Sequence, residues 1–358
     1  MAAGTLPLEI CTRIVHHMHP SDMPPLCRVN KGFQRVAERK LYSTLYLYDA
    51  QLAYRASLAI IANDGARGHY VKRLYFYQDP RRSSSRVPIP GQFWQTFQYA
   101  LSTMTELREL LVNDPTGAST WILDPTKLKF QLHVAKLHLF WDEDMVAFLQ
   151  TQSQLRHLQT MDIPESSQIL PLSTECLPAL EYFDGPLLVA AEVLSCPNLT
   201  HIRTTVDDGL FELIPQFVES AVISGTPLRS LHVNIIPEPF LRTTLDALTS
   251  DPKWCGRMRH LGIIVMPWGD RSGIHRHLAK LHNLYSLAFD VSFLESAPLE
   301  LMHRAFAMEM HIYCPSLRRV AFWLGHHHVY PWVYHHEKWI CNGVLTPGQV
   351  EEQIWLSV

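Results

Sequence analysis

The sequence predicts an α/β protein in which short parallel strands alternate with helices, preceded by a separate group of three helices. Short apolar runs that fit the pattern L-x-x-L-x-L recur between residues 71 and 325, at a mean interval of about 27 residues. Apolar residues at helical spacing separate these runs, and proline stands at several helix-to-strand turns, as in Cys196-Pro197 and Cys314-Pro315. Strand and helix therefore alternate along most of the chain.

The composition is that of an ordinary globular protein. The 358 residues are 47% hydrophobic and 18% charged, with a net charge of −3, so a disordered chain is excluded. This charge balance offers no basic surface for nucleic acid or an anionic membrane, and neither partner is expected. No transmembrane segment or secretory leader is expected. The seven scattered cysteines are expected to be reduced, mostly buried thiols.

Residues 1–48 are expected to form three short helices. Pro7 opens the first helix, where its missing N–H costs nothing. One apolar stripe follows at i, i+4, i+8 and i+12, made of Leu6, Ile10, Ile14 and Met18. Three short helices bury little surface, so this stripe needs a partner. The alternative is a helical cap that seals the first repeat.

A strand–helix repeat is expected over residues 71–325, after a linker helix in residues 49–70. The fourth and sixth positions of each unit are apolar and alternate with variable ones, which is the period of a half-buried strand. The ten expected units begin at Val71, Leu107, Val134, Leu155, Leu180, Leu199, Leu228, Met258, Leu284 and Leu317. Residues 326–358 are expected to form a histidine-rich loop and a C-terminal capping helix. A doubly wound α/β fold is the alternative, but no glycine-rich phosphate-binding motif follows any of the strands.

The third, fifth and seventh positions of each unit are expected to point away from the core. They would line one concave face of a parallel sheet, with the helices on the convex face. Aromatic, histidine and arginine side chains at these positions favour a protein-binding surface, because such residues anchor interfaces. The alternative is a solvated sheet face with incidental aromatics. The residues expected to contact a target are Arg73, Tyr75, Tyr77, His138, Phe140, His157, Arg203, His232 and Trp323.

No catalytic site, metal site or cofactor is expected. The densest histidine cluster, His326-His327-His328 with His335-His336, has the composition of a solvated loop. It lacks the spacing of His-Glu-x-x-His or of a Cys/His zinc finger. The nucleophile motif Gly-x-Ser-x-Gly is absent as well.

Two parts of the chain resemble known families. Leu6-Pro7-x-Glu9-Ile10, followed by Ile14, Ser21-Asp22, Leu26-Cys27-Arg28-Val29 and Phe33, resembles the F-box over about residues 4 to 47. Residues 71–325 resemble the leucine-rich repeat family, especially at Cys196-Pro197-Asn198-Leu199 and Cys314-Pro315-Ser316-Leu317. The fold class implied is a three-helix F-box followed by a leucine-rich-repeat-like solenoid.

The resemblance implies the substrate receptor of a Skp–cullin–F-box ubiquitin ligase, a non-catalytic intracellular protein of the cytoplasm, the nucleus or both. F-box proteins bind a Skp-type adaptor, which joins them to a cullin and a RING subunit, while a repeat domain captures the protein to be ubiquitinated. Carried over to this sequence, the adaptor contacts are Leu6, Pro7, Ile10, Ile14, Leu26 and Val29. A scaffold that does not direct degradation is the first alternative. An enzyme that uses the histidine-rich loop is a more distant one.

Overall fold

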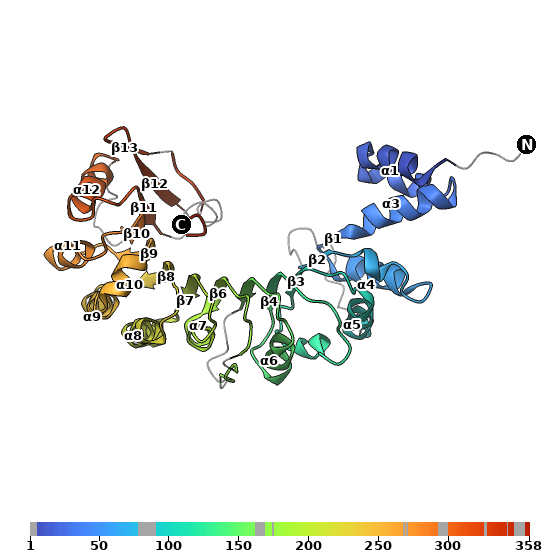
Figure 1. Cartoon of the computed structure of the whole chain (residues 1–358), viewed down its shortest axis with the longest axis horizontal. Coiled ribbons are helices and arrows are strands. Elements are labelled where there is room, and N and C mark those ends of the chain that lie inside the picture. Colours follow the sequence, from blue (N-terminus) through green and yellow to red (C-terminus); the bar gives the residue numbers. More distant parts are fainter. Residues whose placement is uncertain are drawn as a thin grey trace, which may run out of the picture. The chain divides into compact units, whose positions relative to one another are not determined.

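The chain forms two compact units, residues Met1–Leu177 (unit 1) and Pro178–Val358 (unit 2). The computed structural model describes residues 6–77, 91–161, 169–173, 175–267, 269, 271–292, 300–325, 328–341, 343–346 and 355–358. Each unit is an α/β structure in which neighbouring strands pair in sequence order, and helices line one face of the strands (Figure 1). The predicted α/β class is therefore confirmed.

Unit 1 begins with helices and continues with parallel strands. Its α-helices are α1 (Leu8–His17), α2 (Met23–Leu26), α3 (Lys31–Ser43), α4 (Ala50–Ile61), α5 (Phe93–Thr103) and α6 (Glu143–Gln150). Its 3₁₀ turns are η1 (Pro20–Asp22), η2 (Gly68–Tyr70) and η3 (Thr120–Leu123). Its strands are β1 (Thr44–Leu47), β2 (Arg73–Phe76), β3 (Glu109–Asn113), β4 (Val134–His138) and β5 (His157–Thr160).

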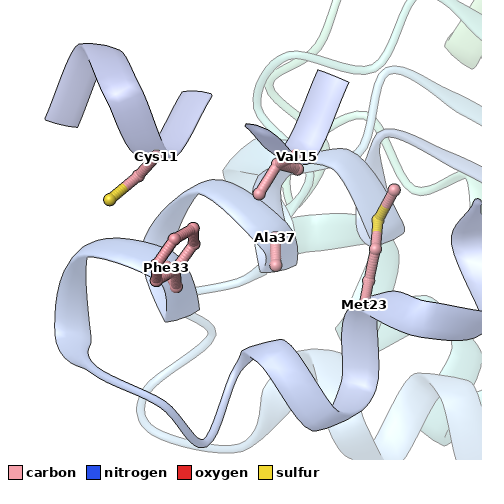
Figure 2. Close-up of a cluster of buried hydrophobic side chains, with 5 residues drawn as sticks. All are labelled: Cys11, Val15, Met23, Phe33 and Ala37. Carbon is pink, nitrogen blue, oxygen red and sulfur yellow. The ribbon is translucent and has the colours of Figure 1, made fainter. Parts of the chain in front are cut away.

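The first three helices enclose a small core of their own. Its buried side chains are Cys11, Val15, Met23, Phe33 and Ala37 (Figure 2). Asn30 caps α3, because its side-chain oxygen accepts a 2.8 Å hydrogen bond from the backbone N–H of Phe33. Lys40 of α3 donates to three carbonyls at the C-terminal end of α1, at 3.0–3.2 Å. The Val15 carbonyl also accepts from the backbone N–H of Met18. Carbonyls at the end of a helix have free acceptor capacity, so Lys40 ties α1 to α3 through them.

The sheet begins one strand earlier than predicted. β1 pairs in parallel with β2, and the expected linker helix, α4, connects the two strands and packs on α5. The predicted start of the repeat at residue 71 is therefore too late. The sequence hides β1 because α3 runs into it without a glycine or proline between them.

One predicted unit has the wrong frame. The pairing of β3 with β4 sets Ala135 opposite Leu110 and Leu137 opposite Val112. The unit therefore begins at Leu132 rather than at Val134. A slip of two residues keeps every side chain on its expected face, because side chains alternate along a strand.

Unit 2 continues the alternation and ends in antiparallel strands. Its helices are α7 (Leu187–Val193), α8 (Ile214–Ser224), α9 (Glu238–Leu248), α10 (Pro252–Arg257), α11 (Ser272–Leu278) and α12 (Glu300–Tyr313), with the 3₁₀ turn η4 (Asp208–Leu213). Its strands are β6 (Tyr182–Pro186), β7 (His201–Thr205), β8 (Ser230–Ile236), β9 (His260–Val265), β10 (Ser286–Asp290), β11 (Arg319–Leu324), β12 (His328–His335) and β13 (Lys338–Cys341). The ten predicted strands are present as β2 to β11.

The predicted histidine-rich loop is wrong over residues 328–341, which form β12 and β13. β12 pairs antiparallel with β11, and β13 pairs antiparallel with β12. Trp332 and Trp339 are buried in this hairpin and supply the apolar surface that a solvated loop would lack. His326 and His327 lie outside the described residues.

The C-terminal capping helix is not found in the part of its range that is described. Residues 347–354 lie outside the described residues, and Trp355–Ser357 forms a turn. Trp355 is nevertheless buried, with 3% of its surface exposed.

Five of the seven cysteines are buried, in agreement with the expectation of mostly buried thiols. Burial raises the pKa of the Cys176 thiol to about 11. Among the described residues, no helix is both long enough and apolar enough to cross a lipid bilayer.

Gly68 provides a test of the packing in unit 1. A Cβ atom on Gly68 would lie 2.6 Å from the carbonyl carbon of Thr103, at the end of α5. Because that neighbour is backbone, we expect Gly68→Ala to lower the free energy of unfolding by about 1–3 kcal/mol in urea titrations. Gly91→Ala is the control, since nothing lies within 4 Å of its Cβ position. Equal stabilities of the two variants would contradict this packing.

Candidate functional site

Helix α1 presents an apolar stripe to solvent. Ile10 and Ile14 are each 40% exposed, and Leu6, which lies just before the helix, is 47% exposed. The fourth predicted member, Met18, is not part of this stripe, because it lies at the C-cap of α1 and packs against the three-helix core. The buried residues of the same helix, Cys11 and Val15, point into the three-helix core. The helical period therefore gives α1 one face for its own core and one apolar face without a covering element among the described residues.

The other predicted adaptor contacts have different environments. Pro7 is exposed at the N-cap of α1. Val29 is 63% exposed, in the turn before α3. Leu26 instead packs partly against the three-helix core. The prediction missed Leu8, which is 43% exposed and lines a groove of about 340 Å³ between α1 and α3.

The face of the sheet opposite the helices is called the helix-free face. In unit 1 it carries a tyrosine pair, because β1 and β2 set Tyr46 beside Tyr75 with ring centroids 4.9 Å apart. Glu109 on β3 accepts a hydrogen bond from the hydroxyl of Tyr75 and pairs with Arg73 at 3.2 Å. Burial, together with the hydrogen bond to the Glu109 carboxylate, raises the pKa of Tyr75 to about 12.

Two predicted target contacts therefore touch a common partner, Glu109, while the remaining unit 1 contacts lie apart from it. Tyr77 is exposed just beyond the end of β2. His138 lies at the end of β4 opposite Asn113, and Phe140 covers Gly117. Burial lowers the pKa of His157 on β5 to about 4, with Lys136 as a smaller cause.

The prediction missed Tyr46, which is 62% exposed beside Tyr75. Its strand was not recognised, so its position on the helix-free face could not be assigned. The apolar residues Leu45 and Leu47, which alternate with Tyr46, were the available signal.

In unit 2 the helix-free face is largely buried. The third and fifth positions of the repeat units in this part of the chain include four residues that are at most 6% exposed. They are Ser230, His232, His260 and Ser286. The predicted contact His232 is therefore not available to a target. Arg203 lies 3.7 Å from Asp184 in a partly buried ion pair. Trp323 packs against a cluster made of Ile263, Ala288, Ala321 and Val329.

A serine and two histidines form a chain of hydrogen bonds under this face. The Ser286 hydroxyl bonds Nδ1 of His260, and Nε2 of His260 lies 3.0 Å from Nδ1 of His232. A serine that bonds one histidine, which in turn bonds a second, is an arrangement that can activate the serine as a nucleophile. Ser286 and His260 are, however, completely buried. Burial also lowers the pKa of His260 to about 3, which makes it a poor base at neutral pH. The chain is therefore structural.

The residues at the C-terminal end of the chain contribute to this burial. Ser230 donates a 3.1 Å hydrogen bond to the carbonyl of Trp355, and the rings of His201 and Trp355 meet edge to face at 6.2 Å. Nε2 of His201 donates to the Val358 carbonyl oxygen at 3.2 Å. Arg319 donates to the Ser357 hydroxyl at 2.8 Å.

Within the described ranges, no group of three or more His, Cys, Asp or Glu side chains could hold a metal ion. No protein-family model matches the chain, and no curated protein matches it in sequence. The candidate sites are two surfaces, the α1 stripe and the helix-free face.

His303 on α12 provides a test of histidine burial. Its ring stacks on Phe322 at 4.7 Å, and neither ring nitrogen has a hydrogen-bond partner among the described residues. Burial lowers the pKa of His303 to about 4, so below pH 6.5 the unfolded chain takes up a proton that the folded chain does not. Stability contributed by neutral His303 is therefore present above pH 6.5 and is lost as pH falls toward 4.

We expect His303→Phe to stabilise the chain by roughly 1 kcal/mol at pH 7, because it removes two buried polar atoms without partners. The slope of unfolding free energy against pH between 4 and 6.5 should fall by up to about 1.4 kcal/mol per pH unit. Urea unfolding at a series of pH values measures both effects. His335→Phe, at an exposed position of the same unit, should leave the slope unchanged. An unchanged slope in His303→Phe would contradict the conclusion that burial lowers the pKa of His303.

Proposed function

We propose that the chain is the substrate receptor of a Skp–cullin–F-box type ubiquitin ligase. Its first three helices dock on a Skp-type adaptor, and its strand–helix repeat binds a target protein. The receptor itself performs no chemistry. It raises the effective concentration of a target lysine near a conjugating enzyme held elsewhere in the complex.

The observation that carries this proposal is the exposed stripe of α1. Ile10 and Ile14 on α1, and Leu6 just before it, are each at least 40% exposed, and the opposite face of α1 is already packed. Exposed aliphatic side chains in a row on one helix are typical of a face that docks on another protein. Completing their burial would contribute roughly 1 kcal/mol for each side chain.

The rigidity of the three-helix group favours the same role. Lys40 and Asn30 fix the ends of α1 and α3, so the stripe is held in place before a partner arrives. A docking surface that is already ordered loses little conformational entropy on binding.

Co-purification with a Skp-type adaptor tests the docking half of the proposal. We expect the wild-type chain to form a stoichiometric complex. A variant with Leu6→Ala, Pro7→Ala and Ile10→Asp should bind at least ~30-fold more weakly, because the interface would have to bury an unpaired carboxylate. Circular dichroism checks that the variant stays folded.

Ile223→Asp is the matched control, because Ile223 is 77% exposed on α8 in the other unit. It should bind the adaptor as the wild type does. If the wild type fails to bind, the three helices are a cap on the repeat and the receptor proposal is wrong. Adaptor binding without any change in the abundance of captured partners would favour the scaffold alternative.

A further inference from the structure

The residues Trp355–Val358, called the tail, lie on the helix-free face of unit 2 as a bound peptide would. Trp355 is the anchor, with 3% of its surface exposed. Its ring meets His201, which in turn stacks on Tyr182 with ring centroids 4.5 Å apart. A deeply buried aromatic side chain is the usual centre of a peptide-binding site.

The polar contacts of the tail are mostly independent of its sequence. Ser230 bonds the carbonyl of Trp355, and His201 bonds the carbonyl of Val358. The bond from Arg319 to the Ser357 hydroxyl uses a side chain of the tail. Another segment that adopts the same turn, with a tryptophan at the same place, can form the same backbone contacts.

A basic cavity lies beside the tail. This cavity of about 720 Å³ is lined by Ser357, Val358 and three arginines, Arg229, Arg257 and Arg259. Among the described residues, no aspartate or glutamate lines it, and none of the three arginines forms an ion pair with a described side chain. The side chains of Ser357 and Val358 are uncharged, so neither forms an ion pair with the arginines.

We infer that this face of unit 2 is a binding site for a target segment with a tryptophan followed, a few residues later, by acidic side chains, and that the tail occupies the site in cis. The tryptophan takes the place of Trp355, and the acidic side chains reach Arg229, Arg257 and Arg259. The inference deepens the receptor proposal, because it names the chemistry of the captured segment. It involves no residue of the α1 stripe.

Competition with the tail makes the site selective. A tethered segment has a high effective concentration, commonly in the millimolar range for short linkers. A free segment that only copies the tail is therefore excluded. A segment that also pairs with the arginines gains interactions that the tail lacks, and it displaces the tail.

Fluorescence anisotropy with labelled, amidated peptides tests the inference on the full chain without any adaptor. The probe is Ile-Trp-Leu-Ser-Val-Glu-Glu, with Ala in place of Trp in one control and Gln-Gln in place of Glu-Glu in another. We expect the probe to bind the Trp355→Ala chain at least tenfold more tightly than the wild type. The Ala peptide should bind at least tenfold more weakly than the probe. The Gln-Gln peptide should lose severalfold at low salt and less at high salt.

Trp121→Ala is the control for loss of a tryptophan, since Trp121 is 39% exposed in unit 1. It should bind the probe as the wild type does. Should Trp355→Ala fail to fold, Arg229→Gln with Arg259→Gln serves instead, because both side chains are exposed. That variant should weaken the probe's binding to the otherwise wild-type chain severalfold.

Equal binding of the probe and the Ala peptide would overturn the inference, and so would equal binding to the wild type and Trp355→Ala. Because no adaptor is present, failure here leaves the docking of α1 untouched. Failure of the adaptor experiment likewise leaves this result untouched.

Discussion

Parallel pairing of very short strands is the constraint on which both units depend. The carbonyl of Lys72 accepts hydrogen bonds from the N–H groups of Arg108 and Glu109, and the carbonyl of Arg259 accepts from Tyr285 and Ser286 in the same way. The strands of unit 1 contain four or five residues, which is too few for a strand to be stable alone. Each repeat therefore exists only on its neighbour.

Stacked strands leave one face for the helices and one face for other uses. The helix side is filled by aliphatic and aromatic rows, with rings such as Phe76 and Phe97 5.6 Å apart. On the helix-free face, unit 1 keeps tyrosines and charged residues partly exposed, whereas unit 2 buries three histidines, of which His201 contacts the residues Trp355 and Val358. The same repeat thus offers an open surface in one unit and an occupied one in the other.

Several features of the two candidate surfaces could be predicted from the sequence, because they follow from the period at which apolar residues recur along helices and strands. The spacing of Leu6, Ile10, Ile14 and Met18 predicted one apolar stripe, of which the structure exposes the first three members and packs Met18 against the three-helix core. The alternation along β2 to β11 predicted which side chains lie on the helix-free face. The burial of His232 was not predictable, since it depends on what covers the strand rather than on the strand itself.

The sequence by itself determined the α/β class, the positions of ten strands and the polarity of each strand face, because these depend on local periods of two and 3.6 residues. Only the tertiary structure decided that β1 joins the sheet, that residues 328–341 form a hairpin, and that Trp355 lies against β7 and β8. Of these contacts, the pairing of β1 with β2 and the bond between Ser230 and Trp355 join segments far apart in the chain. No local pattern encodes such pairings, which arise from the fit of apolar surface and hydrogen-bonding groups in the folded unit.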